Sequence, residues 1–141
     1  MNQTKIDYLT HSWNPLAMRC TPAGPGCAHC WHLRLADRFK ENPMFPPEVR
    51  AAYAGSGPPV LIERRLREPM RKTAPAVIGV QFNGDLFHPN VKTDDIIQVY
   101  EVMAASPQHT FVVLTKRPER IAKVLYGEGG GWYLGGGCRI I

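Results

Sequence analysis

The second half of this chain repeats one pattern twice, a short apolar run followed by an amphipathic helix. The runs PAVIGVQF (75–82) and HTFVVLT (109–115) are nearly continuous in Val, Ile and Phe, as is typical of strands buried on both faces of a parallel sheet. A strand, a helix, a strand and a helix in that order make parallel βαβ units. The sequence therefore predicts an α/β fold.

The two helices of this repeat are expected over residues 93–106 and 117–127. In the first, apolar residues recur at helical spacing, and the buried stripe is predicted to be Ile96, Val99, Tyr100 and Met103. Thr93 is expected to cap it, and Pro118 and Gly127 suit the first turn and the end of the second helix.

The first half of the chain is less regular. A helix is predicted from about Cys27 to Asn42, with an apolar stripe of Trp31, Leu35 and Phe39. Residues 43–59 are rich in Pro and Gly, so they are expected to form a surface excursion with one helical turn at 47–53. Residues 60–72 are expected to form a short strand and then a helical turn in which Leu66 and Met70 share a face.

Length and charge limit the range of functions. With 141 residues the chain is one domain, which we place at 1–126, with a Gly-rich tail or short last strand at 127–141. No apolar run is long enough for a membrane helix and no signal peptide is recognisable, so a cytoplasmic protein is expected. The net charge of +5 is concentrated in 63–72 and 115–120, a pattern that suits a phosphate-bearing partner or simply a solvated surface.

Three of the four cysteines lie in the segment RCTPAGPGCAHCWH (19–32), with the spacing C-x6-C-x2-C. In a chain without an export signal, clustered cysteines more often bind metal or react than form disulfides. Three hypotheses compete for Cys20, Cys27 and Cys30, of which the redox pair leaves Cys20 without a role. They are a structural zinc completed by His29 or His32, a redox-active pair made by Cys27 and Cys30, and an iron–sulfur cluster with one open iron. The role of Cys138 is left open, since a lone cysteine in a Gly-rich tail is more often incidental.

Polar residues follow each predicted strand. Ligand sites of α/β sheets lie at the carboxyl ends of the parallel strands. The cysteine loop after a first strand in SWNPLAM (12–18), NGDLFH (83–88) after the second strand and TKRPER (115–120) after the third are therefore expected to converge. Each segment alone also fits an ordinary turn or helix start. Together they predict a site whose polar members are Asn83, Asp85, His88, Thr115, Lys116 and Arg117.

Three blocks, SWNPLAMRCTPAGPGCAHCW, FNGDLFHPNV and ASPQHTFVVLTKRPER, resemble an uncharacterised three-cysteine family of phages and prophages. That family is similar to radical S-adenosylmethionine enzymes. The resemblance covers residues 3–126 and fits poorly at 43–59. It implies a partial parallel (β/α) barrel of about three to four βα units, radical-SAM-like and incomplete at its C-terminus.

The resemblance also implies a chemistry. Cys20, Cys27 and Cys30 would hold a [4Fe–4S] cluster whose open iron binds S-adenosylmethionine for reductive cleavage to a deoxyadenosyl radical. Asn83, Gly84 and Asp85 match the motif that contacts the methionine amino group, and His29 stands where an aromatic residue often lies near the adenine. The first gap of the cysteine motif is longer than the usual C-x3-C-x2-C, and the chain looks C-terminally truncated, so an open barrel edge could support an oligomer.

Two functions follow as hypotheses. In the first, the protein is a radical-SAM-like iron–sulfur enzyme acting on a nucleic acid or nucleotide, with His88, Thr115, Lys116 and Arg117 as candidate substrate contacts. In the second, it is a non-catalytic phage protein with a zinc (Cys3His) or vestigial cluster site that binds a host or phage partner. They differ in the metal and in its fourth ligand.

Overall fold

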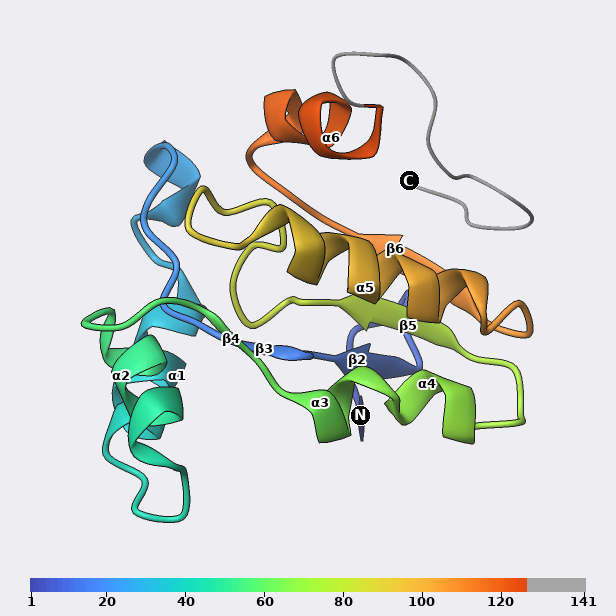
Figure 1. Ribbon diagram of the computed structural model, residues 1–141, viewed down its shortest axis with the longest axis horizontal. Helices are drawn as coiled ribbons and strands as arrows, with labels where there is room; N and C mark the ends of the chain where they lie inside the picture. The colour runs from blue at the N-terminus through green and yellow to red at the C-terminus, as the bar shows by residue number, and fades with distance from the viewer. Residues whose placement is uncertain (127–141) are drawn as a thin grey trace.

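A computed structural model describes residues 1–126 of the chain (Figure 1). Its main sheet has four strands in the order β1-β2-β5-β6. They are β1 (Asn2–Gln3), β2 (His11–Trp13), β5 (Val77–Val80) and β6 (Thr110–Val113). A separate ladder pairs β3 (Leu16–Ala17) with β4 (Val60–Leu61).

The sheet is mostly parallel, which confirms the α/β prediction. β5 pairs in parallel with β2 and with β6, while β1 adds an antiparallel edge that the sequence analysis missed. The two strongly apolar runs form the adjacent strands β5 and β6, with Val80 opposite Val113. Within residues 1–126 the sheet stays open and does not close into a barrel.

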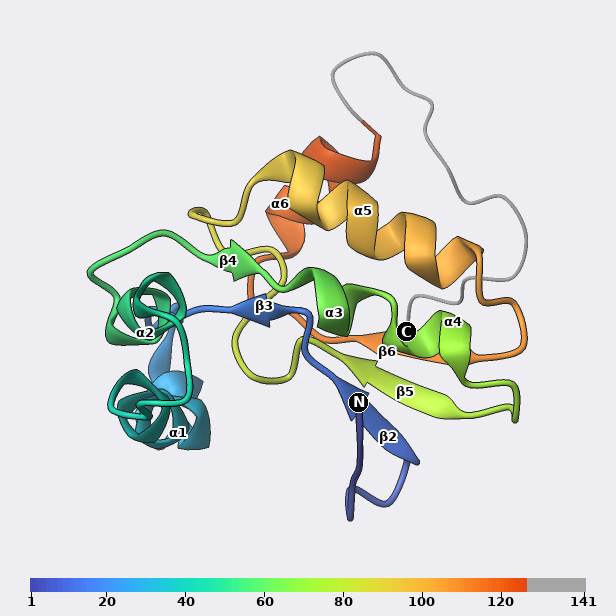
Figure 2. The same ribbon diagram turned by 60° about the horizontal axis from the view of Figure 1, so that its bottom comes forward.

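The main core lies where helices cover one face of this sheet. α5 (Thr93–Ala104) lies along β5 and β6, and the short helices α3 (Glu63–Leu66) and α4 (Glu68–Arg71) pack beside it (Figures 1 and 2). The predicted stripe of α5 is confirmed, since Ile96, Val99, Tyr100 and Met103 are all buried. They join Trp13, Ile78, Val80, Phe111 and Val113 from the strands in one apolar cluster.

A second, smaller core joins α1 (Trp31–Lys40) to α2 (Pro47–Ala54), and the pair stands apart from the sheet (Figure 2). Val49, Ala52 and Tyr53 of α2 are buried in it, so the predicted surface excursion contains a packed helix of two turns. Proline at the first helical positions and Gly55 at a left-handed C-cap (φ 80°) explain how a Pro- and Gly-rich segment forms a helix.

Several predicted details are wrong. α1 begins at Trp31 rather than near Cys27, because Cys30 is extended (φ −66°, ψ 116°) and separates α1 from a 3-10 turn, η1 (Pro25–Cys27). Trp31 is 49% exposed, and the buried positions of α1 are His32 and Ala36. Thr93 does not cap α5, since Lys92 holds the N-cap position without a side-chain bond.

The region before β5 also differs from expectation. Leu66 is buried but Met70 is 47% exposed, because α3 ends at Leu66 and α4 starts a new turn at Glu68. α6 (Pro118–Leu125) begins with Pro118 as predicted. The expected stop at Gly127, the tail or short last strand and Cys138 lie outside the described residues. No helix in residues 1–126 is both long and apolar enough to cross a membrane.

Candidate metal and cofactor site at the carboxyl edge of the sheet

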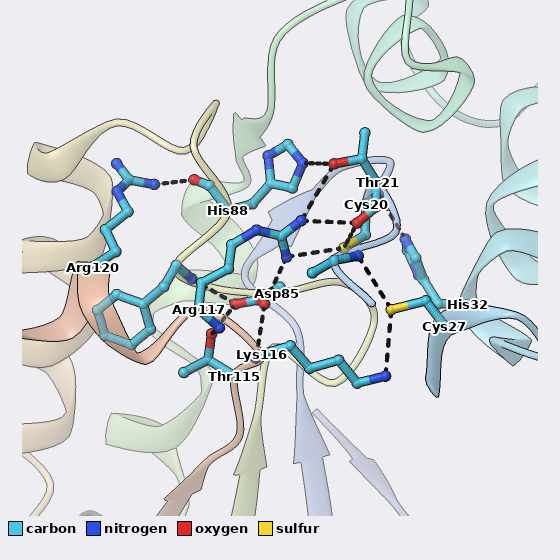
Figure 3. Close-up of polar contacts among 12 residues, drawn as sticks. Cys20, Thr21, Cys27, His32, Asp85, His88, Thr115, Lys116, Arg117 and Arg120 are labelled. Carbon is cyan, nitrogen blue, oxygen red and sulfur yellow. Dashed lines mark hydrogen bonds and ion pairs between the residues drawn. The ribbon is translucent and has the colours of Figure 1, made fainter. Parts of the chain in front are cut away.

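Three segments meet at the carboxyl edge of the parallel strands. They are the cysteine loop between β3 and α1, the segment after β5 and the segment after β6 (Figure 3). Side chains from all three contact one another, although the segments are separated by about 30 to 97 positions of sequence. The predicted convergence of the strand ends is therefore present in the structure.

Asp85 lies at the centre of these contacts and is 5% exposed. Its Oδ1 accepts hydrogen bonds from the Phe87 N–H (2.9 Å) and the Thr115 hydroxyl (2.7 Å). Its Oδ2 accepts from the Lys116 N–H (3.3 Å) and from Arg117 Nη1 (2.9 Å). Both oxygens are thus used to join the segment after β5 to the segment after β6.

Arg117 extends this network to the cysteine loop. Besides its buried ion pair with Asp85, it donates through Nη2 to the Thr21 carbonyl (2.8 Å), and its Nη1 lies 3.8 Å from the Cys20 sulfur. Burial opposes the charged form of Arg117, but the hydrogen bonds to Asp85 and Cys20 raise its pKa above the ordinary value. Arg117 therefore remains a cation that holds the loop against the sheet.

The Cys27 sulfur also receives donors from two sides. The Ala23 N–H lies 3.4 Å from it and Lys116 Nζ lies 3.3 Å away. Chiefly the Ala23 hydrogen bond, and then Lys116, lower the pKa of the Cys27 thiol, which favours the thiolate. The thiolate of Cys27 is therefore favoured by a loop N–H and a lysine.

Cys20 has a different environment. Burial raises the pKa of its thiol, and the bond from Arg117 acts in the opposite direction. Cys20, Cys27 and Cys30 are all free and half-buried. Cys30 is the N-cap residue of α1.

His32, one of the two candidate fourth ligands for zinc, is hydrogen-bonded to the backbone of the cysteine loop. It is 2% exposed, and its Nε2 accepts a hydrogen bond from the Cys20 N–H (3.2 Å). Burial, with help from Arg19, lowers the pKa of His32 to about 4, so the ring is neutral. The other candidate, His29, is exposed.

The arrangement of the cysteines is not that of a preformed metal site. Within residues 1–126, no three His, Cys, Asp or Glu side chains are placed so that they could hold a metal ion as they stand. Residues 21–26 are exposed and contain two Pro and two Gly, so few packed contacts resist a rearrangement of the loop. Metal binding would therefore require the sulfurs to move together.

His88 was predicted from its position after β5 and lies in this network, contacting Thr21. Its Nδ1 accepts from the Asn90 N–H (3.2 Å), and its Nε2 lies 2.9 Å from the Thr21 hydroxyl. Burial and the nearby Arg117 lower the pKa of His88. Arg120 of α6 donates to the carbonyls of His88 and Val91 and so holds this loop in place.

Asn83 and Gly84 have backbone roles. The Asn83 N–H donates to Asn14 Oδ1 (2.8 Å). Gly84 has φ +135°, and a Cβ there would lie 2.7 Å from the Met18 sulfur. Glycine is therefore required for this close approach to the residue two positions before Cys20.

Sequence reasoning missed Gln81, which organises the base of the site. It is buried with a left-handed φ of 54°. Its side-chain amide accepts from the Leu16 N–H (3.0 Å) and donates to the carbonyls of Leu16 (3.1 Å) and Asn83 (3.0 Å). Gln81 could have been found from the sequence, because it is a polar residue within the apolar run 75–82.

A cavity of about 350 Å³ borders the site on the side of α2. Its polar lining residues are Arg19, Cys20, Thr21 and Asn90, and its other lining residues are Pro22, Leu33, Ala54, Gly55, Gly57 and Pro59. Thr21 and Arg19 were not singled out from the sequence. Their position next to Cys20 in the sequence was the one feature that could have pointed to them.

The fold and the site define a mixed α/β protein with a cysteine-rich loop at the carboxyl edge of a mostly parallel sheet. The chain belongs to the family of proteins of unknown function DUF5131, whose model matches residues 3–132. Neither a curated protein nor a solved structure matches the chain.

Proposed function

We propose that this protein is a radical-SAM-like iron–sulfur protein in which Cys20, Cys27 and Cys30 hold a [4Fe–4S] cluster and S-adenosylmethionine is the co-substrate. The substrate would be a nucleotide or nucleic acid. The open, mostly parallel sheet would then be part of a (β/α) barrel. One observation supports the proposal most, namely that cationic residues from the end of β6 donate directly to two of the three cysteine sulfurs.

The donor set fits an iron–sulfur cluster. Such clusters are held by thiolates, and hydrogen bonds to the sulfurs stabilise them and set their potential. Cys27 meets this requirement through Ala23 and Lys116, and Cys20 through Arg117. Zinc needs a fourth protein ligand, and His32 already accepts the Cys20 N–H at Nε2, so of the two candidates the exposed His29 is left.

When bound, the cluster would supply an electron for cleavage of the sulfonium bond, with one iron open to the amino and carboxylate groups of S-adenosylmethionine. The protein's own residues would do the rest. Lys116 and Arg117 would balance the negative charge of the thiolates, and Asp85 would keep Arg117 oriented toward Cys20. Gly84 would allow the segment after β5 to approach Met18 closely, which brings it near the cysteine loop.

The predicted contact from Asp85 to the amino group of S-adenosylmethionine would be an additional hydrogen bond. Both carboxylate oxygens of Asp85 already accept hydrogen bonds from protein donors, so the contact stays a prediction. The same holds for Arg117 as a substrate contact, since Asp85 and Thr21 already use its guanidinium. Lys116 is exposed and better placed to meet a substrate.

The test of catalysis is reductive cleavage of S-adenosylmethionine. Protein reconstituted anaerobically with iron and sulfide should release deoxyadenosine when a strong reductant is added, and a Cys30→Ala variant prepared in parallel should not. Cluster loading without deoxyadenosine in the wild-type protein would refute the enzymatic function and favour a vestigial site.

A further inference from the structure

The cavity beside Cys20 has the size and the charge of a binding site for a small anion-bearing molecule. Its volume of about 350 Å³ lies at the small end of the ~300–1,000 Å³ of ligand pockets. That space suits one small molecule rather than a length of polymer. The cavity is bounded by the cysteine loop, Leu33 of α1, the end of α2 with the residues after it, and Asn90.

The charges around the cavity favour an anion. Among the described residues 1–126, Arg19 is the one charged residue in the lining of the cavity, and no carboxylate lines it. Asp37, the acidic partner of Arg19, is shared with Lys40, since its Oδ1 lies 2.9 Å from Arg19 Nη1 and 2.9 Å from Lys40 Nζ. Two cations and one carboxylate leave this group with a net positive charge.

Thr21, which lines the cavity, adds a hydrogen-bond donor. His88 accepts at Nδ1 from the Asn90 N–H, so its neutral ring carries the proton on Nε2 and donates to the Thr21 oxygen. Arg117 Nη2 donates to the same oxygen at 3.3 Å. With both lone pairs of the oxygen engaged, the Thr21 hydroxyl proton is left for an acceptor outside this network.

Gly55 keeps the arginine side of the cavity in place. It has φ +80°, and a Cβ there would lie 3.0 Å from Arg19 Cδ. Arg19 also donates to the Tyr53 carbonyl at 3.4 Å and so lies against the end of α2. Arginine, a threonine hydroxyl and an amide side chain together offer several donors to one oxyanion.

We propose that this cavity binds the phosphate group of a small molecule the size of a nucleoside monophosphate. The proposed function is needed only to assign the bound molecule the role of substrate. Binding itself requires Arg19, Thr21 and Asn90 and no cluster, so the two proposals fail separately.

The experiment is a calorimetric titration of the full chain with adenosine 5′-monophosphate, inorganic phosphate, adenosine and a short single-stranded oligonucleotide. The monophosphate should bind saturably, inorganic phosphate should compete with it, and adenosine should bind at least tenfold more weakly. The proposal is overturned if adenosine binds as well as the monophosphate, if only the oligonucleotide binds, or if none of the probes binds.

Two pairs of variants locate the site. Thr21→Val should weaken monophosphate binding about tenfold, whereas Thr110→Val, at an exposed threonine of β6, should leave it unchanged. Asn90→Asp places a negative charge in the cavity lining at an exposed position and should weaken binding at least as much, while Asn2→Asp in β1 should not. Since Asn90 is exposed, this variant remains informative if Thr21→Val fails to fold. Wild-type affinity in a folded Thr21→Val protein or in Asn90→Asp would place the ligand elsewhere and overturn the proposal.

Discussion

Arg117 and Asp85 form a buried ion pair, with Nη1 and Oδ2 2.9 Å apart and side chains 10% and 7% exposed. The pair joins the end of β6 to the end of β5, and Arg117 continues to the cysteine loop through Thr21 and Cys20. Arg117 is therefore one of the residues that fix the position of that loop, together with Lys116 and His88.

Removal of one member of the pair should be costly. Arg117→Met leaves the Asp85 carboxylate buried without its cation, so we expect the free energy of unfolding to fall by about 3 kcal/mol. The matched control is Arg67→Met, which breaks the exposed pair with Glu63 (2.6 Å; side chains 62% and 64% exposed) and should cost less than about 0.5 kcal/mol. Urea unfolding of both variants measures the difference, and equal losses would show that the buried pair has no special role.

Gly84 should tolerate no side chain. In Gly84→Ala the new Cβ meets the Met18 sulfur at 2.7 Å and the backbone stays at φ +135°, so a loss of about 1–3 kcal/mol is expected. Gly24→Ala is the control, since Gly24 is extended (φ 174°) and a Cβ there meets nothing within 4 Å. Thermal unfolding measures both variants, and equal unfolding temperatures for Gly84→Ala and Gly24→Ala would contradict this account.

Acid should loosen the loop that carries His88. The pKa of His88 is lowered in the folded protein, so its neutral form contributes stability that is present above the unfolded value of about 6.5 and is lost as the pH falls below it. Protonation would also remove the Nδ1 acceptor of the Asn90 N–H. The free energy of unfolding should therefore fall between pH 7.5 and pH 5, and less steeply in His88→Asn. Identical slopes for the variant and the wild-type protein would mean that other groups carry the acid sensitivity.

The ligand assignment makes a prediction for each cysteine. Cys20→Ala, Cys27→Ala and Cys30→Ala should each lose most of the iron bound after anaerobic reconstitution, whereas Cys138→Ala should retain it. Iron and sulfide analysis with the visible absorption spectrum measures the loss. Full iron content in the Cys20 variant would remove that residue from the ligand set.

The sequence predicted the parts of the fold that repeat a strong local pattern. The predicted bounds of β5, α5, β6 and α6 lie near the observed ones. The reason is that an apolar run or an amphipathic stripe can be recognised from neighbouring residues alone. The strand-end residues Asp85, Thr115, Lys116 and Arg117 do converge, because parallel strands bring their carboxyl ends to one edge.

The missed features depend on contacts between distant parts of the chain. β1, β3 and β4 are two-residue strands, too short for any period to show. α2 is stabilised by Tyr53, which packs against Phe39 of α1 with ring centroids 5.0 Å apart. The Pro- and Gly-rich composition of the segment gives no sign of that contact. The start of α1 was misplaced because the i, i+3 spacing of Cys27 and Cys30 resembles a helix, although a 3-10 turn and an extended Cys30 produce it.

The central claim is that three thiolates of one loop hold an iron–sulfur cluster, and metal analysis of the protein purified without oxygen tests it most directly. We predict about four iron and four sulfide ions per chain after reconstitution, with little zinc. One zinc ion per chain without sulfide would contradict the claim.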